Sequence, residues 1–196
     1  MEFSIDFKDQ LKYRPTSWSR KTEQGPDFDN FNPLAVLILK ELWGFFLPTG
    51  AVLPNQKLAR ISFKFFPSDD LLDDPALMEI TRLTGEDFSP IGESSSGDGL
   101  LVSETGKCLL FNQHTGFLLY PGLQIENAVC RIAACTPLMP VEIQGFPQHP
   151  FHVGITPIDG LVARLYPGRP FEPPPFPFDD SQEGFCKIIL EHNDKT

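Results

Sequence analysis

Short hydrophobic runs separated by polar turns dominate residues 88–135, and the expected fold is organised around this stretch. The runs lie at residues 100–103, 108–111 and 117–120, and glycine-containing polar segments separate them at 104–106 and 113–116. Runs of this length, punctuated by glycine and polar residues, are typical of β-hairpins. We therefore expect three or four strands in an antiparallel meander.

An apolar stripe with helical spacing follows the meander. Its members fall mostly three or four residues apart: Leu123, Ile125, Ala128, Val129, Ile132 and Ala133. This spacing places them on one face of a helix, which we expect to cover the apolar face of the meander.

Two helices upstream begin at an Asn/Asp-Pro pair, which supplies an N-cap side chain and a proline at the first helical position. Asn32 precedes a helix over residues 34–43, which is apolar on nearly every side and is therefore expected to be deeply buried; Gly44 ends it. Asp74 precedes a helix over residues 76–83 that Gly85 stops. Between them, residues 58–66 alternate in polarity, which predicts one strand with Ala59, Ile61, Phe63 and Phe65 on its inner face.

These elements predict an α+β fold, in which a mixed or antiparallel β-sheet meander packs against helices. We place one domain at residues 1–136, including an irregular N-terminal arm, and a Pro/Phe-rich extension at 137–196 that packs on it. The extension holds 11 of the 20 prolines. We expect a hairpin over 151–166, an extended tract over 167–178 and a last strand over 185–190. Recognition of the proline tract by an aromatic groove of a partner is the alternative to packing.

Composition indicates a globular protein, because 41% of the 196 residues are hydrophobic. No run approaches the roughly 18 apolar residues of a membrane span, and no basic-then-apolar leader is visible, so we expect a cytoplasmic protein without membrane contact.

The four cysteines show no paired spacing, so we expect reduced, buried thiols; they are Cys108, Cys130, Cys135 and Cys186.

Acidic residues concentrate in one stretch of the chain. The net charge is −10, and residues 66–106 contain ten acids against Arg82 alone, which amounts to −9. Such a field repels nucleic acid and anionic membranes and speeds encounter with basic partners, although a solvated face would also explain it. A calcium loop at residues 69–74 is disfavoured, because the EF-hand pattern is absent.

Residues that could carry out chemistry do not form a known catalytic pattern. The serines at 94–96 lack the Gly-x-Ser-x-Gly elbow, and Gly92, Gly97 and Gly99 lack the Lys-Ser/Thr of a phosphate loop. A polar hairpin loop explains this segment. A pocket formed by His149, His152 and Glu93 is the enzymatic alternative, which requires these side chains to converge. We expect no enzymatic activity, no cofactor and no metal site.

The order of motifs along residues 15–135 resembles the SUKH superfamily, specifically its third family. The matching segments are Ser-Trp-Ser-Arg at 17–20, Leu-Trp-Gly-Phe at 42–45, Ile-Ser-Phe-Lys-Phe-Phe-Pro at 61–67, Ser-Pro-Ile-Gly-Glu at 89–93, Val-Ser-Glu-Thr-Gly-Lys at 102–107 and Ile-Glu-Asn-Ala at 125–128. Phe45 replaces the second glycine of the family's helix-end motif, and residues 89–93 correspond to a loop. The extension has no counterpart.

This resemblance implies a SUKH-like α+β domain and a role as an immunity protein that binds and neutralises a cognate polymorphic toxin, such as a nuclease or deaminase. The acidic stretch agrees, since carboxylates can occupy a basic groove made for phosphate. The expected partner-binding residues are Asp69, Asp70, Asp73, Asp74, Glu93, Asp98 and Glu104. The alternative function is a non-catalytic regulatory or scaffold module.

Overall fold

The computed structural model describes residues 3–13, 28–53, 57–122, 124–147, 162–166 and 169. In these ranges one mixed sheet runs in the strand order β1-β2-β5-β6-β7-β8-β9-β10-β11. Its strands are β1 (Lys12–Tyr13), β2 (Phe45–Leu47), β5 (Phe63–Lys64), β6 (Phe88–Ser94), β7 (Asp98–Ser103), β8 (Cys108–Asn112), β9 (Phe117–Tyr120), β10 (Met139–Ile143) and β11 (Ala163–Leu165). A separate ribbon pairs β3 (Val52–Leu53) with β4 (Lys57–Leu58).

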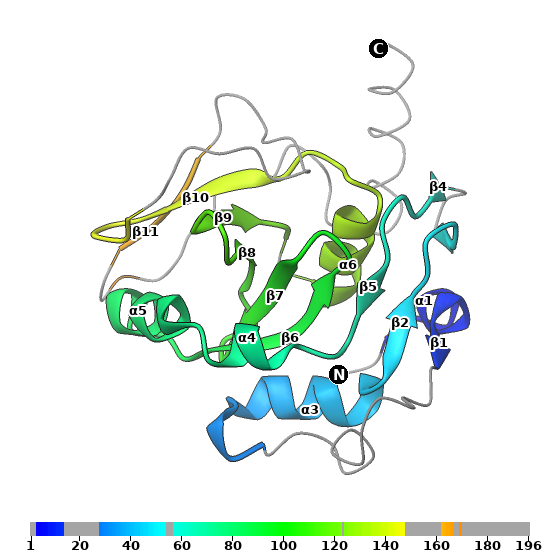
Figure 1. The fold of residues 1–196 in the computed structure, drawn as a ribbon, viewed down its shortest axis with the longest axis horizontal. Coiled ribbons are helices and arrows are strands. Elements are labelled where there is room, and N and C mark those ends of the chain that lie inside the picture. The colour runs from blue at the N-terminus through cyan, green and yellow to red at the C-terminus, as the bar shows by residue number, and fades with distance from the viewer. Residues whose placement is uncertain are drawn as a thin grey trace.

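Helices cover both faces of this sheet (Figure 1). They are α1 (Ile5–Gln10), the 3-10 helix η1 (Phe28–Asn30), α3 (Pro33–Leu42), α4 (Asp69–Leu72), α5 (Pro75–Thr84) and α6 (Ile125–Ala133). The fold is therefore α+β, as expected, with all neighbouring strands antiparallel except the parallel pair β10 and β11.

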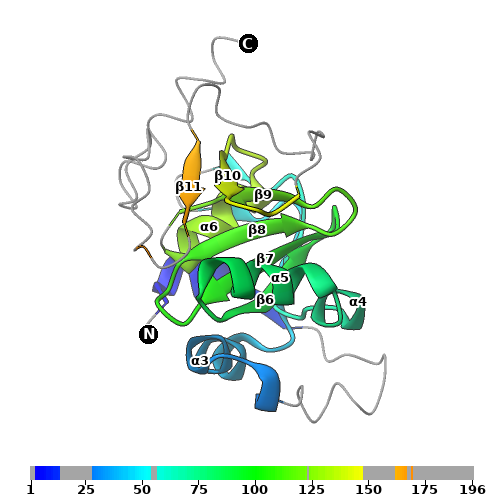
Figure 2. The same cartoon turned by 90° about the vertical axis from the view of Figure 1, so that its left-hand side faces the viewer.

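The antiparallel meander of β6 to β9 is confirmed. Its register aligns Leu100 with Leu110 and Leu110 with Leu119. Successive residues point to opposite faces: Leu100 belongs to the core cluster that contains residues of α1, α3 and α6, whereas Leu101 belongs to the cluster that contains residues of α4 and α5. Because helices bury both faces, the strand sequences are continuous apolar runs and do not alternate between apolar and polar residues. Figure 2 shows α5 on one side of the sheet.

Helix α3 begins where the sequence predicts. The Asn32 side chain accepts the backbone N–H of Ala35 at 2.9 Å, and its amide donates to the carbonyls of Asp87 and Val102 at 3.0 and 2.8 Å. Gly44 follows the helix with φ +78°. The expected burial on nearly every side is wrong, because α3 lies on the surface and Leu37 is 59% exposed.

The single strand expected at residues 58–66 is interrupted. Only β4 and β5 are strands here, because the backbone N–H groups of Arg60 and Ile61 both donate to the carbonyl of Ala133, at the end of α6. The inner-face assignment still holds for Ala59, Phe63 and Phe65, which are buried.

Residues 89–93 belong to β6, although the family pattern indicates a loop. The register shifts between Pro90 and Gly92, which accommodates a proline without an N–H to donate. A Cβ on Gly92 would lie 2.3 Å from the carbonyl oxygen of Lys64, so only glycine lets β5 approach this closely.

The predicted extension contributes β10 and β11 to the sheet. Most of the hairpin expected at 151–166 falls outside the described ranges, as do the tract at 167–178, except Arg169, and the strand at 185–190. Within the described part of the chain, every helix is too short or too polar to cross a lipid bilayer.

Candidate functional site

Four of the predicted partner-binding carboxylates gather around α4, a short helix that the sequence analysis missed. The Ser68 hydroxyl accepts the N–H of Leu71 as the N-cap, which places Asp69 and Asp70 in the first helical turn. Negative charge is stabilising there, because the first N–H groups of a helix point outward. Asp73 caps the other end of α4.

Asp74 is the N-cap of α5 and accepts the N–H of Ala76 at 2.8 Å, as predicted. Asp69, Asp70 and Asp73 are exposed, and Asp74 is half-buried. No ion pair to any of the four occurs in the part of the chain that the structure describes. We refer to Asp69, Asp70, Asp73 and Asp74 as the acidic surface.

Glu93 lies beside this surface, but its carboxylate is already engaged. It forms an ion pair with Lys64 at 2.7 Å and accepts the backbone N–H of Ser68 at 3.2 Å. The side chain is only 15% exposed, so Glu93 holds the start of α4 against β5 and presents little charge to a partner.

Asp98 does not belong to an exposed surface, and its assignment to the partner-binding set is corrected. It is completely buried. Its carboxylate accepts from the hydroxyls of Ser96 and Ser94 at 2.6 and 3.2 Å and from the amide of Asn112 at 2.7 Å. These three donors satisfy a charge that would be costly to bury alone.

Glu104 is exposed but lies apart from the acidic surface. Its backbone N–H donates to the carbonyl of Asp87, at the end of the β6–β7 pair opposite to Glu93. Nearby, Glu86 pairs with Lys107. The predicted set therefore divides into the acidic surface with Glu93, the buried Asp98, and a distant Glu104.

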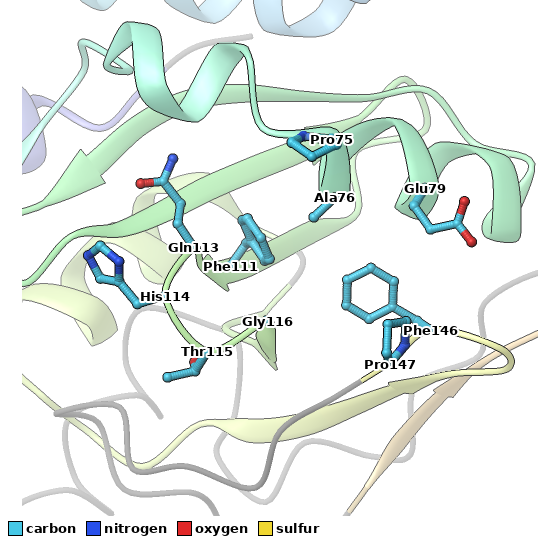
Figure 3. Close-up of a pocket in the computed structure, with 10 residues that line it drawn as sticks. All are labelled: Pro75, Ala76, Glu79, Phe111, Gln113, His114, Thr115, Gly116, Phe146 and Pro147. Atoms are coloured by element: carbon cyan, nitrogen blue, oxygen red, sulfur yellow. The ribbon is translucent and has the colours of Figure 1, made fainter.

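An open groove lies next to the acidic surface, with a volume of about 390 Å³. It is lined by the start of α5, by the β8–β9 turn and by the residues after β10 (Figure 3). Pro75 and Ala76 come from α5, Phe146 supplies aromatic surface, and the buried Phe111 of β8 lies beneath them. Pro75 follows the acidic surface directly in the chain, so the two features are continuous.

The polar residues around the groove carry little net charge of their own. Glu79 forms a bidentate ion pair with Arg82, one helical turn further on, and the hydrogen bonds from Arg82 lower the pKa of Glu79. His114 and Gln113 lie on the β8–β9 turn, and His114 is exposed.

Asp98 positions this turn. Asn112, which donates to the Asp98 carboxylate, uses its own oxygen to accept the N–H groups of His114 and Thr115, both at 3.1 Å. The Thr115 hydroxyl donates to the same oxygen at 3.0 Å. A carboxylate expected to touch a partner instead orders one wall of the groove from below.

The residues considered for catalysis do not assemble into a described site. Ser94 and Ser96 hydrogen-bond to Asp98, and within the described residues neither hydroxyl forms a hydrogen bond with a histidine. His149 and His152 lie outside the described ranges, so the enzymatic pocket with Glu93 is untested. Among described residues, no group of three or more His, Cys, Asp or Glu side chains is placed to hold a metal ion.

The cysteines whose side chains are described are reduced thiols. Cys108 and Cys130 are buried, and Cys135 is half-buried at φ +54° after α6. Burial raises the pKa of the Cys135 thiol; Arg60 opposes this shift and Asp98 adds to it. Such a thiol is a weak nucleophile at neutral pH. Cys186 lies outside the described ranges.

Two parts of the site escaped the sequence analysis for different reasons. Helix α4 has a local signal, since Ser68 is an N-cap residue followed by two aspartates. The groove has none, because Pro75, Phe111 and Phe146 come from three distant segments.

Comparison with known proteins provides no relative from which to transfer a function. No protein-family model, no curated protein and no solved structure matches this chain.

Proposed function

We propose that this protein is a non-catalytic binding module, an immunity protein that neutralises a cognate protein toxin through its acidic surface. The resemblance of its motif order to the third SUKH family supports the immunity role. The single observation that carries the binding role is the acidic surface itself, where three exposed carboxylates and a fourth half-buried one lie within six residues without a cation.

A toxin that acts on nucleic acid needs a basic groove to hold phosphate, and a carboxylate cluster can occupy that groove in its place. The exposed charges contribute chiefly to the rate of encounter, because rim charges steer association more than they add affinity. The proposed partner is therefore a basic protein surface and not nucleic acid or an anionic membrane, both of which the acidic surface repels.

The first prediction concerns this steering. The triple variant Asp69→Asn, Asp70→Asn, Asp73→Asn changes the net charge from −10 to −7. At low ionic strength it should bind the toxin with an association rate about fivefold to tenfold lower, whereas near 1 M salt the two rates should converge, because salt screens the attraction. Stopped-flow or surface plasmon resonance measurements over a salt series check this.

A matched control removes the same number of charges elsewhere. Asp6→Asn, Asp9→Asn, Asp87→Asn also gives −7, and all three side chains are exposed outside the acidic surface. This control should retain most of the parent rate. Equal rates for the parent and the first variant at low salt would rule out the acidic surface as the docking face.

The immunity role is tested by the gene that neighbours this one. A large adjacent gene that encodes a toxin should yield a product that is lethal alone, tolerated on co-expression with this chain, and recovered with it as a complex. Continued lethality together with no complex would contradict the proposal. Absence of an adjacent toxin gene would favour the scaffold alternative.

A further inference from the structure

We propose that the groove beside α5 receives an apolar anchor side chain of the protein partner, and that lysine or arginine residues flank this anchor. This inference rests on the proposed binding role and names the chemistry that the partner brings to it. The groove consists of Pro75, Ala76, Glu79, Phe111, Gln113, His114, Thr115, Gly116, Phe146 and Pro147 (Figure 3).

The size of the groove suits an anchor residue. Its volume of about 390 Å³ exceeds the roughly 150 Å³ of a cavity that holds benzene, so a large aromatic or aliphatic side chain fits. Phe111 is buried in the sheet and Phe146 is half-buried after β10, and together with Ala76 they provide an apolar floor. Buried aromatic and aliphatic anchors commonly provide most of the affinity of a protein interface.

The openness of the groove favours a protein segment over a small molecule. Ligand pockets enclose about 70–90% of the surface of their ligand, which an open depression does not achieve. A side chain that projects from a larger partner needs no such enclosure, because the surrounding interface excludes water.

Charge complementarity with the acidic surface indicates which residues should flank the anchor in the partner. Pro75 lines the groove and directly follows Asp73 and Asp74, so groups beside an inserted anchor meet the acidic surface. Among the described lining residues there is no lysine or arginine, and the one acid, Glu79, forms an ion pair with Arg82. A basic segment around the anchor is therefore attracted by the acidic surface, and the one described cation at the groove, Arg82, is already paired with Glu79.

The rim of the groove also offers polar groups to a partner backbone. No hydrogen bond involves the Gln113 amide or the His114 ring within the described residues, and both side chains lie on the turn that Asn112 and Asp98 hold in place. A polar, solvent-accessible rim around an apolar floor is the arrangement typical of protein interfaces.

Three synthetic peptides test the inference by NMR on the full ¹⁵N-labelled chain. The first has one tryptophan between two pairs of lysines, the second has serine in place of tryptophan, and the third has glutamates in place of lysines. The tryptophan–lysine peptide should shift the amide signals of Ala76, His114 and Gly116, with an affinity at least fivefold above that of either other peptide.

Two groove variants make the assignment specific. Gln113→Trp fills the groove and Phe146→Ala removes a wall; each should reduce affinity for the first peptide at least fivefold. Leu37→Trp adds the same aromatic group on the exposed face of α3 and should leave the affinity unchanged. If Phe146→Ala unfolds the chain, Gln113→Trp still tests the groove, because the Gln113 side chain forms no hydrogen bond with another described residue that its replacement would break.

Several outcomes would overturn the inference. Equal binding of the serine and tryptophan peptides would show attraction to charge alone, and shifts outside the groove would show another site. Concentration-dependent shifts in the groove without any peptide would assign it to a second copy of this chain. The proposed function fails separately, when a co-expressed toxin forms no complex, so groove binding with no toxin complex would remove only the immunity role.

Discussion

At the scale of single residues, burial decides what a carboxylate does. Asp69 and Asp98 belong to the same acidic stretch and carry the same side chain, yet one is exposed on α4 and the other is buried beneath the hydroxyls of Ser94 and Ser96. The exposed residue can attract a partner. The buried one orders the protein, because its charge is fully used by internal donors.

Replacing Asp98 should therefore destabilise the fold. Asp98→Ala removes the acceptor for the buried donors Ser94 and Asn112 and for the exposed Ser96. It should lower the free energy of unfolding by about 3 kcal/mol, because buried groups that lose a charged partner bear their full desolvation cost. The exposed control Asp87→Ala should change it by about 0.5 kcal/mol or less. Urea denaturation measures both, and similar values for the two variants would contradict a stabilising role of the hydrogen bonds to Asp98.

The pH dependence of Cys135 reactivity provides a second test at the scale of single residues. Because burial raises the pKa of its thiol, less thiolate is present at neutral pH than in an ordinary cysteine. Alkylation of Cys135 by iodoacetamide, followed by mass spectrometry of its peptide, should be slower than that of free cysteine, with a midpoint shifted to higher pH. A midpoint below that of the free thiol would contradict the burial.

The sign of the linked stability effect follows from the raised pKa. In the unfolded chain the thiol ionises first as the pH rises, so the unfolded state then binds fewer protons than the folded state. The contribution of Cys135 to stability is therefore present below the ordinary thiol pKa and is lost as the pH rises through the folded value.

At the scale of elements, two helices begin with the same chemistry and are attached to the sheet differently. Both α3 and α5 have an Asn or Asp N-cap followed by proline. Asn32 also donates two hydrogen bonds to strand and loop carbonyls and is buried, whereas Asp74 is half-buried and its side chain bonds its own helix and no other described element. The first cap holds a helix on the sheet; the second mainly sets where α5 starts.

The two caps should contribute differently to the free energy of unfolding. Asp74→Ala should cost about 1 kcal/mol of stability, which is typical of a lost N-cap. Asn32→Ala should cost about 3 kcal/mol, because the hydrogen bonds to the buried Val102 carbonyl and the part-buried Asp87 carbonyl are lost together with the cap. Chemical denaturation of the two variants checks the difference, and equal costs would mean that the bonds from Asn32 to the sheet contribute nothing.

At the scale of the whole molecule, the topology divides the acidic stretch into two groups. Glu93 and Glu104 lie at opposite ends of the β6–β7 pair, which separates them by roughly 15 Å at the rise of a β-strand. That distance exceeds the Debye length of about 8 Å at physiological ionic strength. A partner docked on the acidic surface and the groove is therefore largely screened from Glu104.

Glu104→Gln should consequently change the toxin association rate by less than about twofold at physiological salt, whereas Asp70→Asn should reduce it measurably. Both variants remove one exposed negative charge, so their difference reports position alone. Stopped-flow measurements distinguish them. A larger effect at Glu104 would move the docking face to the opposite end of the sheet.

Local patterns determined the parts of this protein that depend on neighbouring residues in the chain. The meander, both Asn/Asp-Pro helix starts, the glycine stops and helix α6 follow from turn chemistry, capping and periodicity, which act over a few residues. The strand at 58–66 failed because Ala133, more than 70 residues away, bonds the backbone of Arg60 and Ile61. A short pattern contains no information about such a partner.

Only the tertiary structure decided which acids face solvent and where a partner can insert. The sequence alone shows ten carboxylates in one stretch, but not that Asp98 is buried, Glu93 paired or Glu104 distant. The groove likewise exists only because α5, the β8–β9 turn and the residues after β10 meet in space. The exposure of a side chain and the shape of a groove depend on long-range packing, whereas charge and hydrophobic periodicity can be determined from the sequence alone.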